Sequence, residues 1–276
     1  MSALRSASRQ ALDALSEQQN SVFEGRVSAD TMSKIAEELY AVGQLLVAQP
    51  RLRRTLGDPA TAPEARVGLL ENLVSGKIGK QALELARAAV GLRWSSPWDL
   101  TDAIEGAGDD ALFAAAAKGG SLERVEDELF RLERILDANG EAVGLLDEQT
   151  VDGARRTQLL DSLVAGKVSP ITLALLHHAV ASQRKRSVIL AIDDLLEKAA
   201  ARQNRSVARV VSATPLSDVQ EQRLAAALTE MYGRAISVRS ALDPDVRGGL
   251  VVRVGDEVID GSIATRFAAA RAALAG

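Results

Sequence analysis

The chain has 276 residues, a net charge of −4 and no cysteine. The lack of cysteine excludes a disulfide scaffold, a thiol nucleophile and thiolate metal sites. Aromatic residues make up only 3% of the chain and acidic residues outnumber basic ones, so a nucleic-acid-binding surface is not expected.

The first predicted element is a helix over residues 4–20. Its apolar residues fall on one face at helical spacing, namely Leu4, Ala7, Ala11, Leu12 and Leu15. The start of the chain lacks the apolar core of a signal peptide. The longest stretch without a charged residue, 168–183, has sixteen residues, and a membrane span needs about 20. We therefore expect a soluble protein inside the cell.

The next elements belong to an internal repeat with a period of ninety residues. Residues 70–90 (LENLVSGKIGKQALELARAAV) and 160–180 (LDSLVAGKVSPITLALLHHAV) are identical at nine of 21 positions without a gap. The same offset relates two apolar stripes, one formed by Met32, Ile35, Leu39, Val42 and Leu46 and the other by Leu122, Val125, Leu129, Leu132 and Leu136. This agreement predicts a duplicated helical unit, covering about 31–92 and 121–182.

Each copy is predicted to hold the same series of helices. A long amphipathic helix covers 31–48 in the first copy and 121–138 in the second. A later helix ends at Gly76 or Gly166, where glycine can take the left-handed conformation of a helix cap. The series closes with helices at 79–92 and 170–182.

The remaining helical segments connect the copies and end the bundle. Residues 99–118 are predicted to form a connecting helix that bends near Gly106-Ala107-Gly108. Residues 187–203 form the last long helix.

A different pattern begins at Val207. Strands are expected at 207–211, 250–254 and 257–259, a helix at 216–232, alternating apolar residues at 235–241 and a final helix at 263–274. The fold is therefore predicted to be mainly α, with a duplicated helical bundle over 1–204. A small α/β domain of β-α-β-β-α order follows at 205–276.

The motifs that suggest chemistry are better explained by structure. Gly76-Lys77 and Gly166-Lys167 lack the earlier glycine and the following Ser or Thr of a phosphate-binding loop, so we interpret them as helix ends. Adjacent His177 and His178 point about 100° apart on a helix and cannot chelate one metal ion; we expect one in the core and one at the surface.

Charged clusters receive the same interpretation. Asp109-Asp110 and Asp193-Asp194 are taken as solvated helix faces, and Arg51–Arg54 and Arg184–Arg186 as solvated helix ends. The sequence predicts no catalytic residue, cofactor or metal site, although a carboxylate metal site stays open.

Three segments near the C-terminus resemble a known family. They are SATPLS at 212–217, ISVRSALDPDVRGGLVVRVG at 236–255 and VIDGSI at 258–263. Together they are similar to the delta subunit of bacterial F-type ATP synthases, related to the mitochondrial oligomycin-sensitivity-conferring protein. The signature residues carried over are Asp243, Gly248, Gly249, Asp260, Gly261 and Ser262.

The helical part also resembles this family. Residues 112–117 and 120–129 are similar to the first two helices of the family's six-helix bundle. The chain departs from the usual member by repeating most of that bundle, which resembles enlarged subunits of high-GC Gram-positive bacteria.

The resemblance implies a non-catalytic stator subunit in proton-driven ATP synthesis. Such a subunit has one copy per complex and lies at the cytoplasmic face of the cell membrane without spanning it. Its bundle would hold N-terminal helices of the alpha subunits, and its C-terminal domain would bind the b subunit of the peripheral stalk. No nucleic acid or cofactor is implied.

Two pairs of segments could form the groove for the alpha helix. They are 4–20 with 79–92, which we favour because its leading helix is free, and 109–118 with 170–182. The expected contact residues are Leu4, Leu12, Leu15, Leu83 and Leu175.

Two other functions stay open from the residues alone. One is a helical-repeat adaptor that binds proteins but is unrelated to the synthase. The other is a small-molecule enzyme with a site near Gly248-Gly249, although such glycines more often serve a bend.

Overall fold

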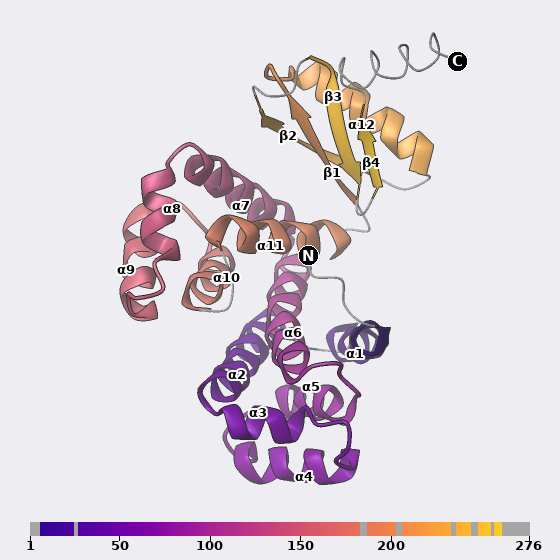
Figure 1. Ribbon diagram of the computed structural model, residues 1–276, viewed down its shortest axis with the longest axis vertical. Helices are drawn as coiled ribbons and strands as arrows, with labels where there is room; N and C mark the ends of the chain where they lie inside the picture. The colour runs from indigo at the N-terminus through magenta and orange to yellow at the C-terminus, as the bar shows by residue number, and fades with distance from the viewer. Residues whose placement is uncertain are drawn as a thin grey trace, which may run out of the picture. The chain divides into compact units, whose positions relative to one another are not determined.

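The computed structural model describes residues 6–24, 27–182, 187–202, 206–232, 236–243, 248–254 and 257–260 (Figure 1). The chain divides into two compact units, residues 1–195 and 196–276. Their boundary falls inside the last helix of the bundle rather than at 204/205. That residues 205–276 form a separate domain stays a prediction.

The first unit is helical, and the helices that precede the sheet form two series, the last helix crossing the boundary between the units. The first series is α1 (Ser6–Glu24), α2 (Ala29–Ala48), α3 (Pro50–Leu56), α4 (Pro63–Val74), α5 (Lys80–Gly91) and α6 (Pro97–Lys118). The second series is α7 (Leu122–Asp137), α8 (Gly140–Asp147), α9 (Gly153–Val164), α10 (Pro170–Ala181) and α11 (Val188–Arg202).

Several helices recur at an interval of ninety residues. Helices α4 and α9 begin and end ninety residues apart, and so do α5 and α10. Ninety residues after α1, the chain is in α6. Helix α6 is therefore the sixth helix of the first copy and the first helix of the second, with no loop between the two roles.

An equivalent glycine follows the fourth helix in both copies, whereas the fifth helix begins with a side-chain cap and a proline only in the second copy. Gly76 and Gly166 have φ angles of 76° and 67°, the left-handed conformation predicted for them. Ser169 caps α10 by accepting a hydrogen bond from the backbone N–H of Thr172, and Pro170 occupies the first turn, where its missing N–H costs nothing.

The predicted apolar stripes form the core of each copy. All ten stripe residues are buried, and Leu39 and Leu129 have no exposed surface. Removing such side chains from water is the main stabilising contribution to a helical bundle.

Helices α2 and α6 lie side by side and antiparallel (Figure 1). Two glycines allow this close approach, because a Cβ atom on Gly108 would lie 2.5 Å from the ring of Tyr40, and one on Gly43 would lie 2.6 Å from the Glu105 side chain. Helix α6 is continuous from Pro97 to Lys118, so Gly108 serves close packing rather than ending a helix segment.

The second unit holds a sheet of four strands, β1 (Ser206–Ser212), β2 (Ile236–Leu242), β3 (Leu250–Val254) and β4 (Glu257–Asp260). Helix α12 (Asp218–Tyr232) follows β1 and precedes β2 along the chain. The strand order is β2-β1-β3-β4. Strands β1 and β2 are parallel, whereas β1 with β3 and β3 with β4 are antiparallel. The sheet thus has one strand more than the predicted β-α-β-β-α order, because the alternating segment at 235–241 also forms a strand.

The core of this unit lies between the sheet and α12. Leu228 of α12 packs with buried residues of the strands, namely Ala208, Val210, Ile236, Val252 and Val254. The mainly α fold with a small α/β region is confirmed. The predicted hairpin turn at Gly255-Asp256 and the final helix at 263–274 lie outside the described residues.

Candidate protein-binding site

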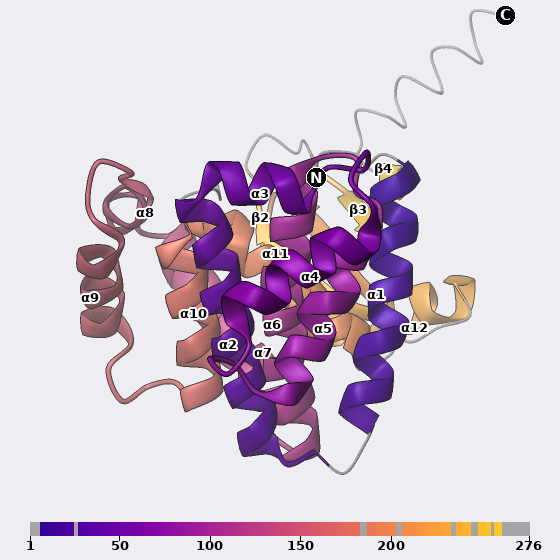
Figure 2. The same ribbon diagram turned by 90° about the horizontal axis from the view of Figure 1, so that it is seen from below.

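The favoured seam lies between α1 and α5, which pack against each other (Figure 2). Ser8 fixes the start of α1, because its hydroxyl donates to Asp99 Oδ2 at 2.6 Å and accepts from the backbone N–H of Ser95 at 2.9 Å. Asp99 lies in the first turn of α6, and Ser95 lies just before the helix. The first copy therefore holds its leading helix by polar contacts as well as by apolar packing.

The five predicted contact residues differ in exposure. Leu12 and Leu83 are half-buried and can contribute to a surface. Leu15 and Leu175 are 1% and 0% exposed, so their side chains belong to the core and cannot line an open groove. Leu4 lies outside the described residues. Binding at this seam stays a prediction that rests on the half-buried positions.

The alternative seam, between α6 and α10, is contacted by Tyr40 of α2. Residues 111–116 of α6 are buried on every side of the helix. The Tyr40 hydroxyl of α2 donates to Asp109 Oδ1 of α6 at 2.8 Å, and the Tyr40 ring stacks on His178 of α10 with centroids 3.9 Å apart and planes 9° apart. Tyr40 thus contacts both helices of this seam.

This buried cluster also contains a second carboxylate. His178 Nε2 lies 3.7 Å from Glu105 Oε2, and Tyr40, Glu105, Asp109 and His178 are each at most 8% exposed. Burial raises the pKa of Tyr40 well above its ordinary value of 10.0, and the charge of Asp109 adds to the effect. The tyrosine therefore stays protonated and keeps its hydrogen bond throughout the neutral range.

A second polar contact is repeated in both copies. Glu38 Oε2 accepts from the backbone N–H of Gly79 at 2.9 Å, and Glu128 Oε2 accepts from that of Ser169 at 2.8 Å. Each pair connects the long second helix of its copy to the start of the fifth helix. These glutamates therefore hold the second and fifth helices of each copy together.

In the second copy this glutamate has additional donors. Thr172 Oγ1 donates to Glu128 Oε2 at 2.6 Å, and Arg124 Nε donates to Oε1 at 2.7 Å. Burial alone would raise the pKa of Glu128, but the hydrogen bonds from Thr172, Ser169 and Arg124 together lower it below its ordinary value. The carboxylate is therefore the form that stabilises the fold.

The expectation for the two histidines is confirmed. His178 is buried against Tyr40, whereas His177 is half-buried and pairs with Asp161 at 2.6 Å. The Gly-Lys segments follow helices α4 and α9, as interpreted from the sequence, and Lys167 Nζ donates to the carbonyl of Leu163.

The interpretation of the charged clusters as solvated was wrong for one residue of each described cluster, whereas Asp194, Arg51 and Arg54 are exposed as expected. Asp109 and Asp193 are 3% and 8% exposed, so they are buried residues rather than solvated ones. Arg53 is also buried, where Nη1 donates to the carbonyl of Leu46 at 2.8 Å and the guanidinium lies 3.5 Å from the centre of the Trp98 ring. Neighbouring helices that a local pattern does not reveal bury these groups. The run at 184–186 lies outside the described residues.

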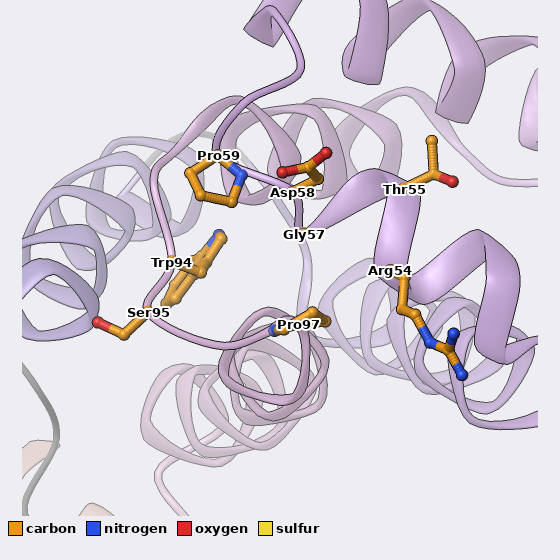
Figure 3. Close-up of a pocket in the computed structure, with 8 residues that line it drawn as sticks. All are labelled: Arg54, Thr55, Gly57, Asp58, Pro59, Trp94, Ser95 and Pro97. Carbon is orange, nitrogen blue, oxygen red and sulfur yellow. The ribbon is translucent and has the colours of Figure 1, made fainter.

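A cleft of about 360 Å³ lies in the first copy (Figure 3). It is lined by Arg54, Thr55, Gly57, Asp58, Pro59, Trp94, Ser95 and Pro97. The indole N–H of Trp94 donates to the carbonyl of Ala89, and Asp58 accepts from the backbone N–H of Ala60. These polar groups therefore serve local structure. Within the described ranges, no group of three or more acidic or histidine side chains is placed to hold a metal ion.

The signature residues of the second unit occupy strand ends and turns. The backbone N–H of Asp243 donates to the carbonyl of Ser212, which ties the end of β2 to the end of β1. Gly248 and Gly249 have φ angles of 74° and 84°, a conformation that favours glycine, immediately before β3. Asp260 pairs with Val251 at the end of β4, and Gly261 and Ser262 lie outside the described residues.

Sequence reasoning missed the Tyr40 cluster. The available signal was the four-residue spacing of Glu105 and Asp109 on a helix, which puts two carboxylates on one face. The partners of these carboxylates are far away in the chain.

No helix in the described part is long and apolar enough to cross a membrane.

Comparison with known proteins identifies the family. The profile described as ATP synthase delta (OSCP) subunit matches residues 110–274, which are the second copy and the C-terminal unit. ATP synthase subunit delta of Streptomyces griseus is 41% identical, over 99% of this chain and 100% of that one. The subunit delta of Corynebacterium diphtheriae is 40% identical, over 99% and 100% of the two chains.

Two further matches differ in extent. ATP synthase subunit b-delta of Mycobacterium sp. strain KMS is 40% identical over 99% of this chain but only 61% of its own length. A chain in the mitochondrial ATP synthase hexamer of Toxoplasma gondii has 26% identity and a TM-score of 0.41, with 61% of this chain and 95% of that one covered.

The full-length relatives include both copies of the repeat, so the duplication is shared with them. The family match leaves no support for an adaptor unrelated to the synthase. The chain belongs to the ATP synthase delta (OSCP) subunit family.

Proposed function

We propose that this protein holds the catalytic head of F-type ATP synthase to the b stalk, gripping an alpha N-terminal helix in the α1–α5 seam. As a delta-family chain it is a stator subunit, a structural part of the complex and a peripheral component of the membrane-bound enzyme. Rotation inside the head produces a counter-torque, which a stator must resist through extensive apolar contact. We further propose one copy per complex, at the cytoplasmic face.

One observation carries the choice of seam. In the second copy the first and fifth helices both contact Tyr40 of α2, and the exposed Asp102 stands where the first copy has the half-buried Leu12. Grooves between amphipathic helices accept the apolar face of a partner helix. An amphipathic N-terminal helix of an alpha subunit is therefore the occupant that we propose for the α1–α5 seam.

The contact with the b subunit is assigned to the C-terminal unit. The mycobacterial relative joins b and delta in its name as one chain, and this protein matches 61% of it. That relative supports a direct association between a delta chain and a b subunit. Removing residues 205–276 should abolish b binding and leave binding of the alpha peptide intact, in a truncated chain shown by circular dichroism to be folded.

The seam is tested by Leu12→Asp in the full chain. A charge in an apolar contact should weaken binding of an alpha N-terminal peptide at least about tenfold, equivalent to about 1.4 kcal/mol, in calorimetry. Leu159→Asp is the control, because Leu159 is a half-buried leucine on α9, which packs against α8 and α10 in the second copy. Normal binding by folded Leu12→Asp protein would exclude the α1–α5 seam.

A further inference from the structure

A helix of the first copy, α2, contacts both helices of the α6–α10 seam through Tyr40. The hydroxyl of Tyr40 is bonded to Asp109 on α6, and its ring lies flat on His178 from α10. These are the first and fifth helices of the second copy. One side chain of α2 therefore closes the seam that the repeat would otherwise duplicate.

The seam has features that fit this side chain. Gly108 has no Cβ, and the Tyr40 ring occupies the space that a Cβ would need. Glu105 Oε2 lies 3.7 Å from His178 Nε2. Tyr40, Asp109 and His178 are all buried, so the contact excludes solvent from the seam.

The equivalent positions in the first copy lack these features. Ninety residues earlier, Gly108 corresponds to Gln18, which is exposed, and His178 corresponds to Ala88, which is half-buried. Asp109 corresponds to Gln19, which has no formal charge. The two seams share their backbone frame, but only the second has the polar and aromatic groups that hold Tyr40.

We propose that α2 is a built-in occupant of the α6–α10 seam, with Tyr40 as its anchor. The chain consequently presents one seam of this kind, α1–α5, to an outside helix. That α1–α5 receives an outside helix rests on the proposed function, whereas the position of α2 does not. A segment of the same chain has a high effective concentration at its site, so an outside helix competes for this seam at a large disadvantage.

The position of α2 is tested first without any partner. The chain has no cysteine, so Asn72→Cys and Ser162→Cys allow two spin labels to be attached selectively. Both positions are exposed, and they are ninety residues apart on α4 and α9. Electron–electron double resonance should give one narrow distribution of distances between the labels, because Tyr40 fixes one copy against the other.

Tyr40→Ala should broaden that distribution about twofold in folded protein, as further orientations become populated. Phe130→Ala is the matched control, since Phe130 is the repeat equivalent of Tyr40 on α7; it should leave the distribution narrow. Tyr40→Phe keeps the stacked ring and serves if Tyr40→Ala unfolds; it should still allow faster hydrogen exchange in residues 36–44. An unchanged distribution in folded Tyr40→Ala, or unchanged exchange in Tyr40→Phe, would overturn the proposal.

The second experiment locates an alpha N-terminal peptide that carries a photo-crosslinker. With the wild-type chain, crosslinks should fall in residues 6–24 and 80–91 and not in 170–181. Crosslinks to 170–181 would show that α2 does not occupy the seam, whatever the peptide does elsewhere. A peptide that binds nowhere would contradict the proposed function, and the label distances would still decide the position of α2.

Discussion

The two copies of the repeat share a backbone frame but differ in their side-chain pairs. Arg66 and Arg156 both donate from Nη1 to the carbonyl ten residues earlier, at 3.3 Å in each copy. By contrast, the surface pair Arg87–Glu71 at 2.9 Å becomes His177–Asp161 at 2.6 Å ninety residues later. Contacts to the backbone are thus retained where charged partners have been exchanged.

This difference shows which contacts define the bundle and which can change. A guanidinium remains charged at every accessible pH, whereas an imidazole is charged only when protonated. The glutamate contacts follow the same division, because Glu38 and Glu128 both accept from a backbone N–H, while only Glu128 has Thr172 as a further donor. The second copy therefore depends more on titratable groups than the first does.

The largest expected effect tests whether the two cores are equivalent. Leu39→Ala and Leu129→Ala should each lower the free energy of unfolding by about 2–5 kcal/mol, because both side chains are fully buried and leave a cavity. Urea denaturation measures both values. A cost below about 1 kcal/mol at either position would show that its copy repacks or contributes little to the core.

The glutamates sharpen the comparison. Glu128→Gln should cost about 1.5–3 kcal/mol near neutral pH, because it removes the charge from a buried acceptor of several hydrogen bonds. The pKa of Glu128 is lowered in the fold, so its stabilisation is complete above the ordinary value and is lost as the pH falls through the lowered one.

The difference in unfolding free energy between wild type and Glu128→Gln should therefore shrink from pH 6 to pH 3. Glu38→Gln is the matched control and should cost less. A difference that is constant with pH would show that the charge of Glu128 is not what stabilises the contact.

The Tyr40 contact gives a smaller effect with the opposite pH direction. Tyr40→Phe should cost about 0.5–1.5 kcal/mol at pH 8, the usual value of one hydrogen bond. The pKa of Tyr40 is raised by burial, so its stabilisation is complete below the ordinary value of 10.0 and is lost as the pH rises towards the raised one.

Wild type should therefore lose more stability than Tyr40→Phe between pH 9 and pH 11 in urea denaturation. The chain has only two tyrosines, so absorbance of tyrosinate can follow the ionisation, with Tyr232→Phe as control. Parallel pH profiles for wild type and Tyr40→Phe would contradict the assignment.

The smallest effect concerns the exchanged surface pairs. Double-mutant cycles should give coupling free energies of about 0.2–1 kcal/mol for both pairs, since solvent screens exposed charges. A coupling free energy above about 2 kcal/mol in either cycle would show that solvent does not screen that pair as an exposed one.

Much of the fold could be predicted because the signals are local. The spacing of Leu39 with its stripe, the turn glycine at Gly76 and the alternation near Val251 depend only on neighbouring residues. Because the helices recur at an offset of ninety residues, two segments of the sequence indicate the same element. The structure places these elements within a few residues of the predicted bounds.

The candidate site was less predictable because it depends on which helices meet. Apolar spacing puts Leu15 and Leu175 on the apolar faces of their helices. It does not distinguish an apolar face that packs in the core from one that is open to a partner. The stack of Tyr40 on His178 joins residues 138 positions apart, so no local pattern contains it. Asp109 was misjudged for the same reason, since the helix that buries it comes much earlier in the chain.

The shared helix α6 also indicates how such a chain can lengthen. Because α6 completes one copy and begins the next, each added period contributes five new helices and reuses one. Growth by whole periods therefore requires no flexible linker and leaves no unpaired first helix, as in helical solenoids whose repeats contact only their neighbours. A tandem insertion of ninety residues whose ends fall within the shared helix would keep the repeated helices aligned. It would also keep the apolar core continuous.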